Sequence, residues 1–273
     1  MKAVIPAAGE GTRMQPATYA VAKEMLPVAG KPAIQHVVEE CEQAGIQEAI
    51  VVIAPDKTEI IQHLTHPDFA SEELAIRFET QTEPQGLGDA VLQDRRRIGD
   101  EDAFAVLYPD NLVRPAPNAP NAIEQLVAVH ERTGGPVTQV IEIEGDRIQR
   151  YVSLDGESAD DEDLHRANGF VEKPEPNEAP SQLAPIGRHI LTTGILPILG
   201  DLDPGHGDAV QLTDARDELA QQRTYHAKEL EGQRLDVGNH QGFLEANLKL
   251  GLENQLLDRA TLEAALDQLT TTE

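Results

Sequence analysis

The pattern that decides the fold is KAVIPAAGEGTR, residues 2–13. Its first five residues form a short, almost entirely apolar run, which is typical of a strand buried on both faces. The run leads into a turn with two glycines, and glycine lets the backbone approach a ligand closely and turn its N–H groups toward an anion. Arg13 then adds a cation. The stretch predicts a buried strand that ends in an anion-binding loop.

The glycine spacing separates this loop from two common nucleotide-binding motifs. A dinucleotide-binding fingerprint needs G-x-G-x-x-G, and a P-loop needs G-x-x-x-x-G-K-[ST], whereas residues 9–13 read GEGTR. A dinucleotide-dependent oxidoreductase on a similar sheet is therefore excluded. Taken alone, the pattern is also compatible with a tight strand-to-loop turn that carries a solvated arginine.

Strands alternating with helices continue beyond the loop. Apolar runs at residues 49–54, 74–79 and 104–108 predict strands, and apolar residues at helical spacing predict a helix at 32–44. This alternation predicts an α/β fold with a mostly parallel, Rossmann-like central sheet and helices on both faces. Ligands of such sheets bind beyond the carboxyl ends of the strands, which is where the glycine loop falls.

The second half of the chain is predicted to elaborate the same domain. Helices are expected at residues 57–64, 88–98, 122–133 and 211–221, the last of them capped by Asp208. Strands are expected at residues 137–143, 169–171 and 187–191. The acidic stretch 155–163 is expected to be an exposed loop. The tail from residue 241 is largely helical by pattern. We expect one domain over residues 1–250 and a C-terminal helical extension, residues 251–273, packed on that domain.

Charge and cysteine content limit the partners and the compartment. The 273 residues include 22 Lys and Arg against 48 Asp and Glu, a formal net charge of −26 that repels nucleic acid. No apolar window approaches the length that a membrane-spanning helix needs. The start turns glycine-rich too early for a signal peptide. Because Cys41 is the single cysteine, a reducing, cytoplasmic compartment is expected.

The acidic residues are spread through every segment, and lysine is scarce. Such surfaces are typical of proteins that stay hydrated in concentrated salt, where self-repulsion is screened. We therefore predict a halophilic protein that loses structure as salt is removed. Circular dichroism across a salt series measures this loss, and a spectrum unchanged on dilution into low salt would contradict the prediction. The same scarcity makes the remaining lysines better candidates for chemistry.

Charged residues that could carry chemistry stand at three further places. Asp110 closes the run at 104–108, Asp236 stands within LDVGN, and Glu172 and Lys173 follow the apolar pair FV. A carboxylate in such a place can hold Mg²⁺, which needs one or two protein carboxylates besides phosphates. Each position is also compatible with a strand-end turn that binds nothing, so none is specific by itself.

Together and in this order, the pieces resemble the sugar-phosphate nucleotidylyltransferase family, most closely its prokaryotic branch that joins UTP to glucose 1-phosphate. The resemblance runs from residue 1 to about residue 250. It rests on several matching runs, among them PAAGEGTRM (6–14), KEMLP (23–27), KPAIQ (31–35), QLTDA (211–215) and DVGN (236–239).

The resemblance implies a Mg²⁺-dependent reaction in which a sugar 1-phosphate oxygen attacks the α-phosphorus of UTP and pyrophosphate leaves. It implies that Arg13 and Lys23 hold the triphosphate, that Lys173 holds the sugar phosphate, and that Asp110 and Asp236 share the Mg²⁺. The implied nucleotide-binding residues are Ala8, Gly9, Gly11, Thr12, Arg13, Gln81 and Gly86, and those at the sugar phosphate are Asn111, Glu172 and Lys173. The resemblance also implies extra strands around the sugar site of the fold, and a homo-oligomer.

Three positions depart from the family pattern. Tyr19 stands in place of a lysine, Ala22 in place of a proline, and Val152 in place of a glycine near the sugar. A β-branched valine cannot imitate the close backbone approach of glycine. Either the loop at Val152 is rearranged or the sugar differs from glucose. The segment TEPQ, residues 82–85, differs near the base pocket.

Two alternatives stay open. The first is a thymidylyltransferase, because the Asp110-Asn111 pair also resembles that branch of the family. Use of dTTP would distinguish a thymidylyltransferase from a uridylyltransferase. A catalytically silent relative that binds nucleotide or sugar would be favoured if a cation or a metal carboxylate of the set were missing, and all are present.

Overall fold

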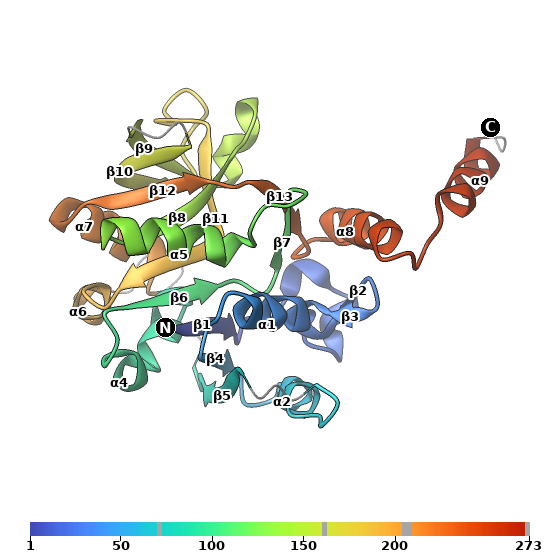
Figure 1. The fold of residues 1–273 in the computed structure, drawn as a ribbon, viewed down its shortest axis with the longest axis horizontal. Helices are drawn as coiled ribbons and strands as arrows, with labels where there is room; N and C mark the ends of the chain where they lie inside the picture. The colour runs from blue at the N-terminus through green and yellow to red at the C-terminus, as the bar shows by residue number, and fades with distance from the viewer. Residues whose placement is uncertain (70–72, 84, 160–162, 204–208, 271–273) are drawn as a thin grey trace.

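The centre of the molecule is a nine-stranded sheet (Figure 1) in a computed structural model that describes residues 1–69, 73–83, 85–159, 163–203 and 209–270. The strand order across the sheet is β5-β4-β1-β6-β11-β8-β12-β10-β9. The bounds of the strands are β1 Lys2–Ala7, β4 Glu48–Ile53, β5 Ala75–Thr80, β6 Ala103–Leu107, β8 Val137–Glu142, β9 Val152–Ser158, β10 Leu164–Glu172, β11 Leu183–Thr192 and β12 Tyr225–Glu229.

Strand directions in this sheet are mostly parallel. The strands β5, β4, β1 and β6 are parallel neighbours, and β12 is parallel to β8. Within the described residues, β11 and β10 alone run against both of their neighbours, so the other seven of the nine strands share one direction. The predicted α/β fold is confirmed.

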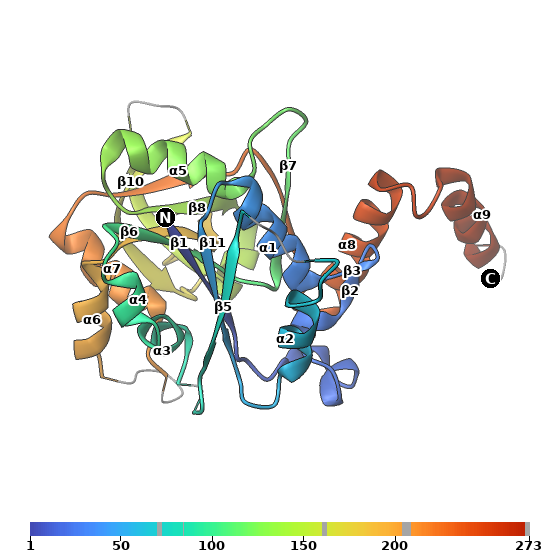
Figure 2. The same cartoon turned by 60° about the horizontal axis from the view of Figure 1, so that its bottom comes forward.

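Helices cover both faces of the sheet (Figure 2). Residues alternate along β1, so that Ala3 and Ile5 belong to the core on one face and Val4 to the core on the other. The first face carries α1 (Ala33–Gln43), α2 (Thr58–Leu64) and α5 (Ala122–Thr133), and the second carries α3 (Leu87–Leu92), α4 (Arg95–Ile98), α6 (Ile195–Asp201) and α7 (Leu212–Gln222). Burial on both faces explains the continuous apolar runs.

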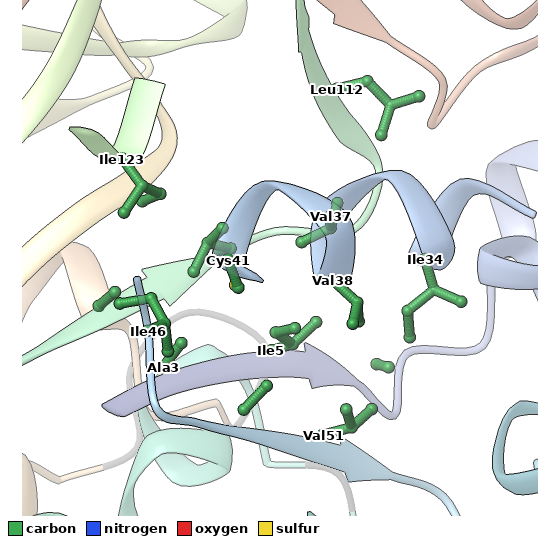
Figure 3. Close-up of a cluster of buried hydrophobic side chains, with 14 of the residues drawn as sticks. Ala3, Ile5, Ile34, Val37, Val38, Cys41, Ile46, Val51, Leu112 and Ile123 are labelled. Atoms are coloured by element: carbon green, nitrogen blue, oxygen red, sulfur yellow. The ribbon is translucent and has the colours of Figure 1, made fainter. Parts of the chain in front are cut away.

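The helix α1 shows how sequence pattern and packing agree. Its apolar residues Ile34, Val37, Val38 and Cys41 recur at helical spacing and lie over β1 (Figure 3). The helix ends before Gly45, whose φ of 70° is the left-handed conformation that glycine adopts at helix ends. Cys41 is fully buried there, and burial raises the pKa of its thiol, so this cysteine serves packing.

Two small strand pairs lie outside the main sheet. The strands β7 (Asn111–Pro115) and β13 (Gly232–Asp236) pair antiparallel, with Asp236 opposite Asn111. The other pair is β2 (Pro27–Val28) with β3 (Lys31–Pro32). The sequence pattern did not predict β7 or β13, and their pairing joins two segments that are far apart in the sequence.

Two predicted elements are wrong in detail. The stretch at 155–163 was predicted as an exposed loop, but β9 occupies its first residues and pairs with β10. Because β9 is the edge strand of the sheet, its acidic residues Asp155 and Glu157 stay exposed while Leu154 is buried. The predicted helix 88–98 is divided into α3 and α4. The predicted cap Asp208 lies outside the described residues.

The two C-terminal helices differ in how they contact the rest of the protein. Helix α8 (His240–Glu253) buries Ala246, and its Asn247 Oδ1 accepts a hydrogen bond from the Ala29 amide at 3.0 Å. Helix α9 (Arg259–Thr270) stands clear of the sheet in both views (Figures 1 and 2), with Leu266 half exposed. Within the described residues, no helix is both long enough and apolar enough to cross a membrane.

A buried ion pair connects α1 to β11. Arg188 is fully buried, and its Nε and Nη2 lie 2.9 and 2.7 Å from the carboxylate oxygens of Glu40. Its Nη1 donates to the carbonyl oxygens of Gly187 and Tyr108, so the pair also holds the end of β6. Such a pair is costly to break, because the remaining charge stays buried without a partner.

Replacing Arg188 by methionine is expected to lower the free energy of unfolding by about 3–5 kcal/mol, because the Glu40 carboxylate is left uncompensated. Urea denaturation followed by circular dichroism measures the change. The double variant Arg188→Met/Glu40→Gln removes the stranded charge and should recover part of the loss. A loss of less than about 1 kcal/mol in the single variant is what an exposed ion pair would give, and it would contradict the expected cost of leaving Glu40 buried without a partner.

Candidate active site

The pairing of β7 with β13 brings the two predicted metal ligands to one place. Asp110 directly precedes β7, Asp236 ends β13, and the amide of Val237 donates to the Asp110 carbonyl oxygen at 3.0 Å. Both aspartates line a cavity of about 310 Å³ together with Arg13 and Lys23. The structure therefore gathers, around one cavity, two carboxylates and two cations that the sequence separates by more than 200 residues.

Asp110 is held by two cations and an amide. Lys23 Nζ lies 2.7 Å and Arg13 Nη2 3.4 Å from its Oδ2, and the Asn111 side chain donates to its Oδ1 at 2.9 Å. Burial raises the pKa of Asp110, but the charge and hydrogen bond of Lys23, with smaller contributions from Asn111 and Arg13, outweigh burial and bring the pKa to about 2. The carboxylate therefore stays ionised and available to a cation.

Lys23 stays charged because carboxylates lie beside it. Burial lowers its pKa, and the charges of Asp110 and Glu24 raise it by more, so the pKa lies above that of a free lysine. A charged ammonium in a largely buried place stabilises negative charge on phosphate more strongly than an exposed one does.

Asp236 has a cationic partner that the sequence analysis missed. Arg234 Nη2 lies 2.9 Å from Asp236 Oδ2, and Arg234 Nε donates to Asn111 Oδ1 at 2.5 Å. The amide of Gly238 donates to Asp236 Oδ1. Because side chains two residues apart on a strand point to the same face, the R-L-D pattern would have found Arg234 if β13 had been predicted.

The glycine loop is built around Gly11. Its φ of 69° is left-handed, and an added Cβ would stand 3.2 Å from the Cβ of Lys23. The Thr18 hydroxyl donates to the Gly11 carbonyl at 2.9 Å. Thr12 and Arg13 follow in a single 3₁₀ turn, Thr12–Met14, and the Arg13 side chain is 68% exposed, which leaves its guanidinium free to reach a ligand.

A buried lysine holds the backbone of this loop by hydrogen bonds. Lys57 is 8% exposed, and its Nζ donates to the carbonyl oxygens of Ala7 at 2.7 Å and Gly9 at 2.6 Å. Its third donor faces Glu24 Oε2 at 2.8 Å. No motif in the sequence indicates a role for Lys57, which belongs only to the few lysines of the chain. Its contacts fix the backbone on both sides of Ala8, which lines a second cavity, of about 450 Å³.

The two other predicted nucleotide-binding residues are Gln81, which follows β5, and Gly86, which precedes α3. Gln81 is 2% exposed, and its amide nitrogen donates to the Asp89 carboxylate and, at 3.4 Å, to the Gly86 carbonyl. Gly86 has a φ of 100°, and an added Cβ would stand 2.8 Å from the Val210 carbonyl oxygen. The requirement for glycine at this position therefore has a packing cause.

The predicted sugar side forms a third cavity, of about 240 Å³. It meets the first cavity at four shared residues: Leu87, Tyr108, Asn111 and Arg234. Glu172 and Val152 line it. Lys173 is among the lining residues of neither cavity. Its side chain is 61% exposed and its Nζ lies 3.2 Å from Glu172 Oε1, so the structure places Lys173 at the outer rim.

The residues at the first cavity fit a divalent cation bound together with phosphates. Within the described residues, no group of three or more His, Cys, Asp or Glu side chains converges as a complete metal site. Two carboxylates at one cavity match the way Mg²⁺ binds, through one or two carboxylates while phosphate and water oxygens fill the other positions.

A glycine turn, two carboxylates and several cations around one cavity beyond parallel strand ends define an α/β protein that handles phosphorylated nucleotides. Comparison with known proteins agrees. The Nucleotidyl transferase family profile matches residues 2–252. UTP–glucose-1-phosphate uridylyltransferase 2 of Streptococcus pyogenes serotype M3 is 37% identical over 272 residues, which covers 93% of this chain and 91% of that protein.

Solved structures give the same result. A UDP-glucose pyrophosphorylase complexed with UDP-glucose has a TM-score of 0.86 and 31% identity, covering 92% of this chain and 98% of that one. A UTP-bound UGPase from Acinetobacter baumannii has a TM-score of 0.86 and 30% identity, covering 98% of both chains. The chain belongs to the nucleotidyl transferase family, so the resemblance predicted from its motifs is confirmed.

Proposed function

We propose that this enzyme transfers a uridylyl group from UTP to glucose 1-phosphate, with formation of UDP-glucose and release of pyrophosphate. The observation that carries the proposal is the convergence of Asp110 and Asp236 with Lys23 and Arg13 on one cavity. The names of the relatives support the substrates, since one is a UTP–glucose-1-phosphate uridylyltransferase and solved relatives bind UTP and UDP-glucose.

Bringing the two substrates together is opposed by their charges. Two unit charges about 4 Å apart repel by roughly 4 kcal/mol at an effective dielectric constant of 20. Lys23 is largely buried at the cavity and Arg13 reaches its edge, so both would neutralise the triphosphate, and Lys173 at the rim would receive the sugar phosphate. Catalysis is then mainly positioning and stabilisation of charge on the leaving pyrophosphate.

Asp110 and Asp236 would hold Mg²⁺, which neutralises charge on phosphate oxygens when it is bound. Within the chain itself, Arg234 fixes the Asp236 carboxylate and Asn111 fixes that of Asp110, so both keep one orientation. Glu172 would accept hydrogen bonds from sugar hydroxyls. We assign reading of the base to the loop around Ala8, Gly9, Gly11 and Thr12, with Gln81 and Gly86 opposite.

Pyrophosphate release tests the proposal. At high salt, UTP, glucose 1-phosphate and Mg²⁺ together should give pyrophosphate, and omission of any one should abolish it. Comparable kcat/KM with UTP and dTTP would defeat a strict uridylyl assignment and favour the thymidylyltransferase alternative. No turnover from a folded protein would favour a silent relative.

We also propose that the enzyme works in the cytoplasm as a homo-oligomer, with residues 1–250 as the catalytic domain. The free, buried Cys41 supports the reducing compartment. Exposed leucines along the C-terminal helices, Leu244, Leu248, Leu266 and Leu269, support self-association. Light scattering coupled to size-exclusion chromatography measures the mass, and a monomer at all concentrations would contradict the oligomer.

A further inference from the structure

The cavity on the sugar side contains a buried cation that the proposed reaction does not use. Arg216, on α7, is 2% exposed and lines this cavity with Tyr108 and Thr213. Among the described residues, its Nε has no hydrogen-bond partner. Arginine is rarely buried to this extent unless it is paired.

Neutral groups surround the Arg216 guanidinium. Its Nη1 lies 3.2 Å from His189 Nδ1, and its Cζ stands 4.5 Å from the centre of the Phe170 ring. Burial, together with the charges of Arg216 and Arg188, lowers the pKa of His189 well below its usual value, so this histidine is neutral. A ring face offsets only part of the cost of burying a cation.

No described carboxylate forms an ion pair with Arg216. Glu172 lines the same cavity, but its own ion pair is with Lys173 at 3.2 Å. Arg234, which also lines the cavity, is paired with Asp236, whereas Arg188 nearby is paired with Glu40. Of Arg188, Arg216 and Arg234, Arg216 alone has no anionic partner in the described part of the chain. A buried cation of this kind is stabilised by an anion on the ligand.

The position of Arg216 indicates which part of the sugar it meets. The phosphate that Lys173 would receive at the rim must come to lie where the first and third cavities join, beside Asn111 and Arg234, because it attacks a nucleotide held near Asp110. Arg216 lines the third cavity only. Its partner is therefore a group on the sugar ring, away from the phosphate.

We propose that this site also accepts a hexose 1-phosphate that carries a carboxylate on the sugar, a hexuronic acid 1-phosphate, and that Arg216 binds this carboxylate. A guanidinium presents a planar pair of donors that matches a carboxylate. Val152, a β-branched residue, lines the same cavity and narrows the space beside the sugar. The inference rests on the proposed uridylyl transfer and names a further acceptor for it.

Binding of two products provides a test that does not depend on turnover. UDP-glucuronic acid and UDP-glucose share the nucleotide and differ at C6, where only the former has a carboxylate. In isothermal titration calorimetry, Arg216→Met should weaken UDP-glucuronic acid about 10- to 100-fold, the range expected for a hydrogen bond to a charged group. Binding of UDP-glucose should stay within about threefold.

Three controls separate recognition from folding. Arg216→Lys keeps the charge and should recover part of the affinity for UDP-glucuronic acid. Arg223 follows the last residue of α7 and does not line the cavity. Arg223→Met should therefore leave the affinities for UDP-glucuronic acid and for UDP-glucose unchanged. Thermal unfolding checks that each variant is folded, and methionine at position 216 removes a buried charge without leaving another one stranded.

Kinetics with the wild-type enzyme complete the test. We expect kcat/KM for glucuronic acid 1-phosphate to equal or exceed that for glucose 1-phosphate, and Arg216→Met to lower their ratio by about tenfold or more. Equal losses for both sugars would overturn the inference and assign Arg216 to the phosphate or to the fold. Absence of pyrophosphate with either sugar would count against the uridylyl transfer itself, while the binding result would still decide the role of Arg216.

Discussion

Replacing Asp110 by asparagine is expected to lower kcat/KM for pyrophosphate release by about 10³-fold or more, since a carboxylate of the metal site is lost where charge must be stabilised. Asparagine has nearly the same shape and can still accept a hydrogen bond from Lys23 Nζ, which lies 2.7 Å from the carboxylate. The change therefore removes charge while it preserves packing. Half-saturation by Mn²⁺, used in place of Mg²⁺, should move to higher concentration.

The pH dependence of the wild-type enzyme follows from the same carboxylate. Because the pKa of Asp110 is depressed to about 2, the ionised form and its contribution to stability are present above the unfolded-state pKa of about 4. As the pH falls, the contribution to stability declines from about pH 4, and the ionised form itself is lost as the pH passes through about 2. Titration of Asp110 should therefore produce no acid limb in the kcat/KM profile above about pH 4.

A matched control separates the site from general charge removal. Asp68 has a 92% exposed side chain beyond α2, and Asp68→Asn should leave kcat/KM and the Mn²⁺ titration unchanged. If Asp110→Asn kept more than about a tenth of the wild-type kcat/KM, Asp110 would not be a metal ligand of this reaction.

The fold was predictable where local pattern and burial coincide. The strands β1, β4 and β6 are covered on both faces and therefore appear as continuous apolar runs, which a sequence reader recognises without any partner. By contrast, β7 and β13 are short and partly exposed, with polar residues at positions such as Asn111 and Arg234. Their pairing depends on contacts between distant segments, and no local pattern encodes it.

The same contrast between local pattern and tertiary contacts applies to the residues of the candidate site. Arg13, Lys23 and Asp110 lie in motifs or at strand ends, so the sequence indicated them. Lys57 immediately precedes α2 and Arg216 lies within α7, and their importance comes from being buried beside particular groups. Burial of a long charged side chain is a tertiary property. Periodicity treats both residues as solvent-facing positions of amphipathic helices.

Replacing Lys57 by methionine is expected to impair both the fold and the glycine loop. The change leaves the Glu24 carboxylate buried without its partner, and the free energy of unfolding should fall by about 3–5 kcal/mol. Burial already raises the pKa of Glu24 with Lys57 beside it, and removal of Lys57 raises it further. Because protonation then relieves the stranded charge, the loss of stability should be larger at pH 8 than at pH 5.

Activity should fall for a separate reason. The carbonyl oxygens of Ala7 and Gly9 lose their shared donor, so the backbone that faces the nucleotide shifts, and a shift of about 1 Å can cost roughly 10²-fold in kcat/KM. We expect the loss to be larger in KM for UTP than in KM for the sugar phosphate. Initial rates with each substrate varied in turn measure this difference.

The double variant Lys57→Met/Glu24→Gln distinguishes the two effects. It removes the buried charge and should recover much of the stability, but the loop carbonyls still lack their donor, so kcat/KM should stay low. Lys31→Met is the matched control, because Lys31 forms a half-exposed pair with Glu39 and its loss should cost less than about 1 kcal/mol. If kcat/KM recovered together with stability in the double variant, Lys57 would act through the fold alone, and the glycine loop would hold its conformation without it.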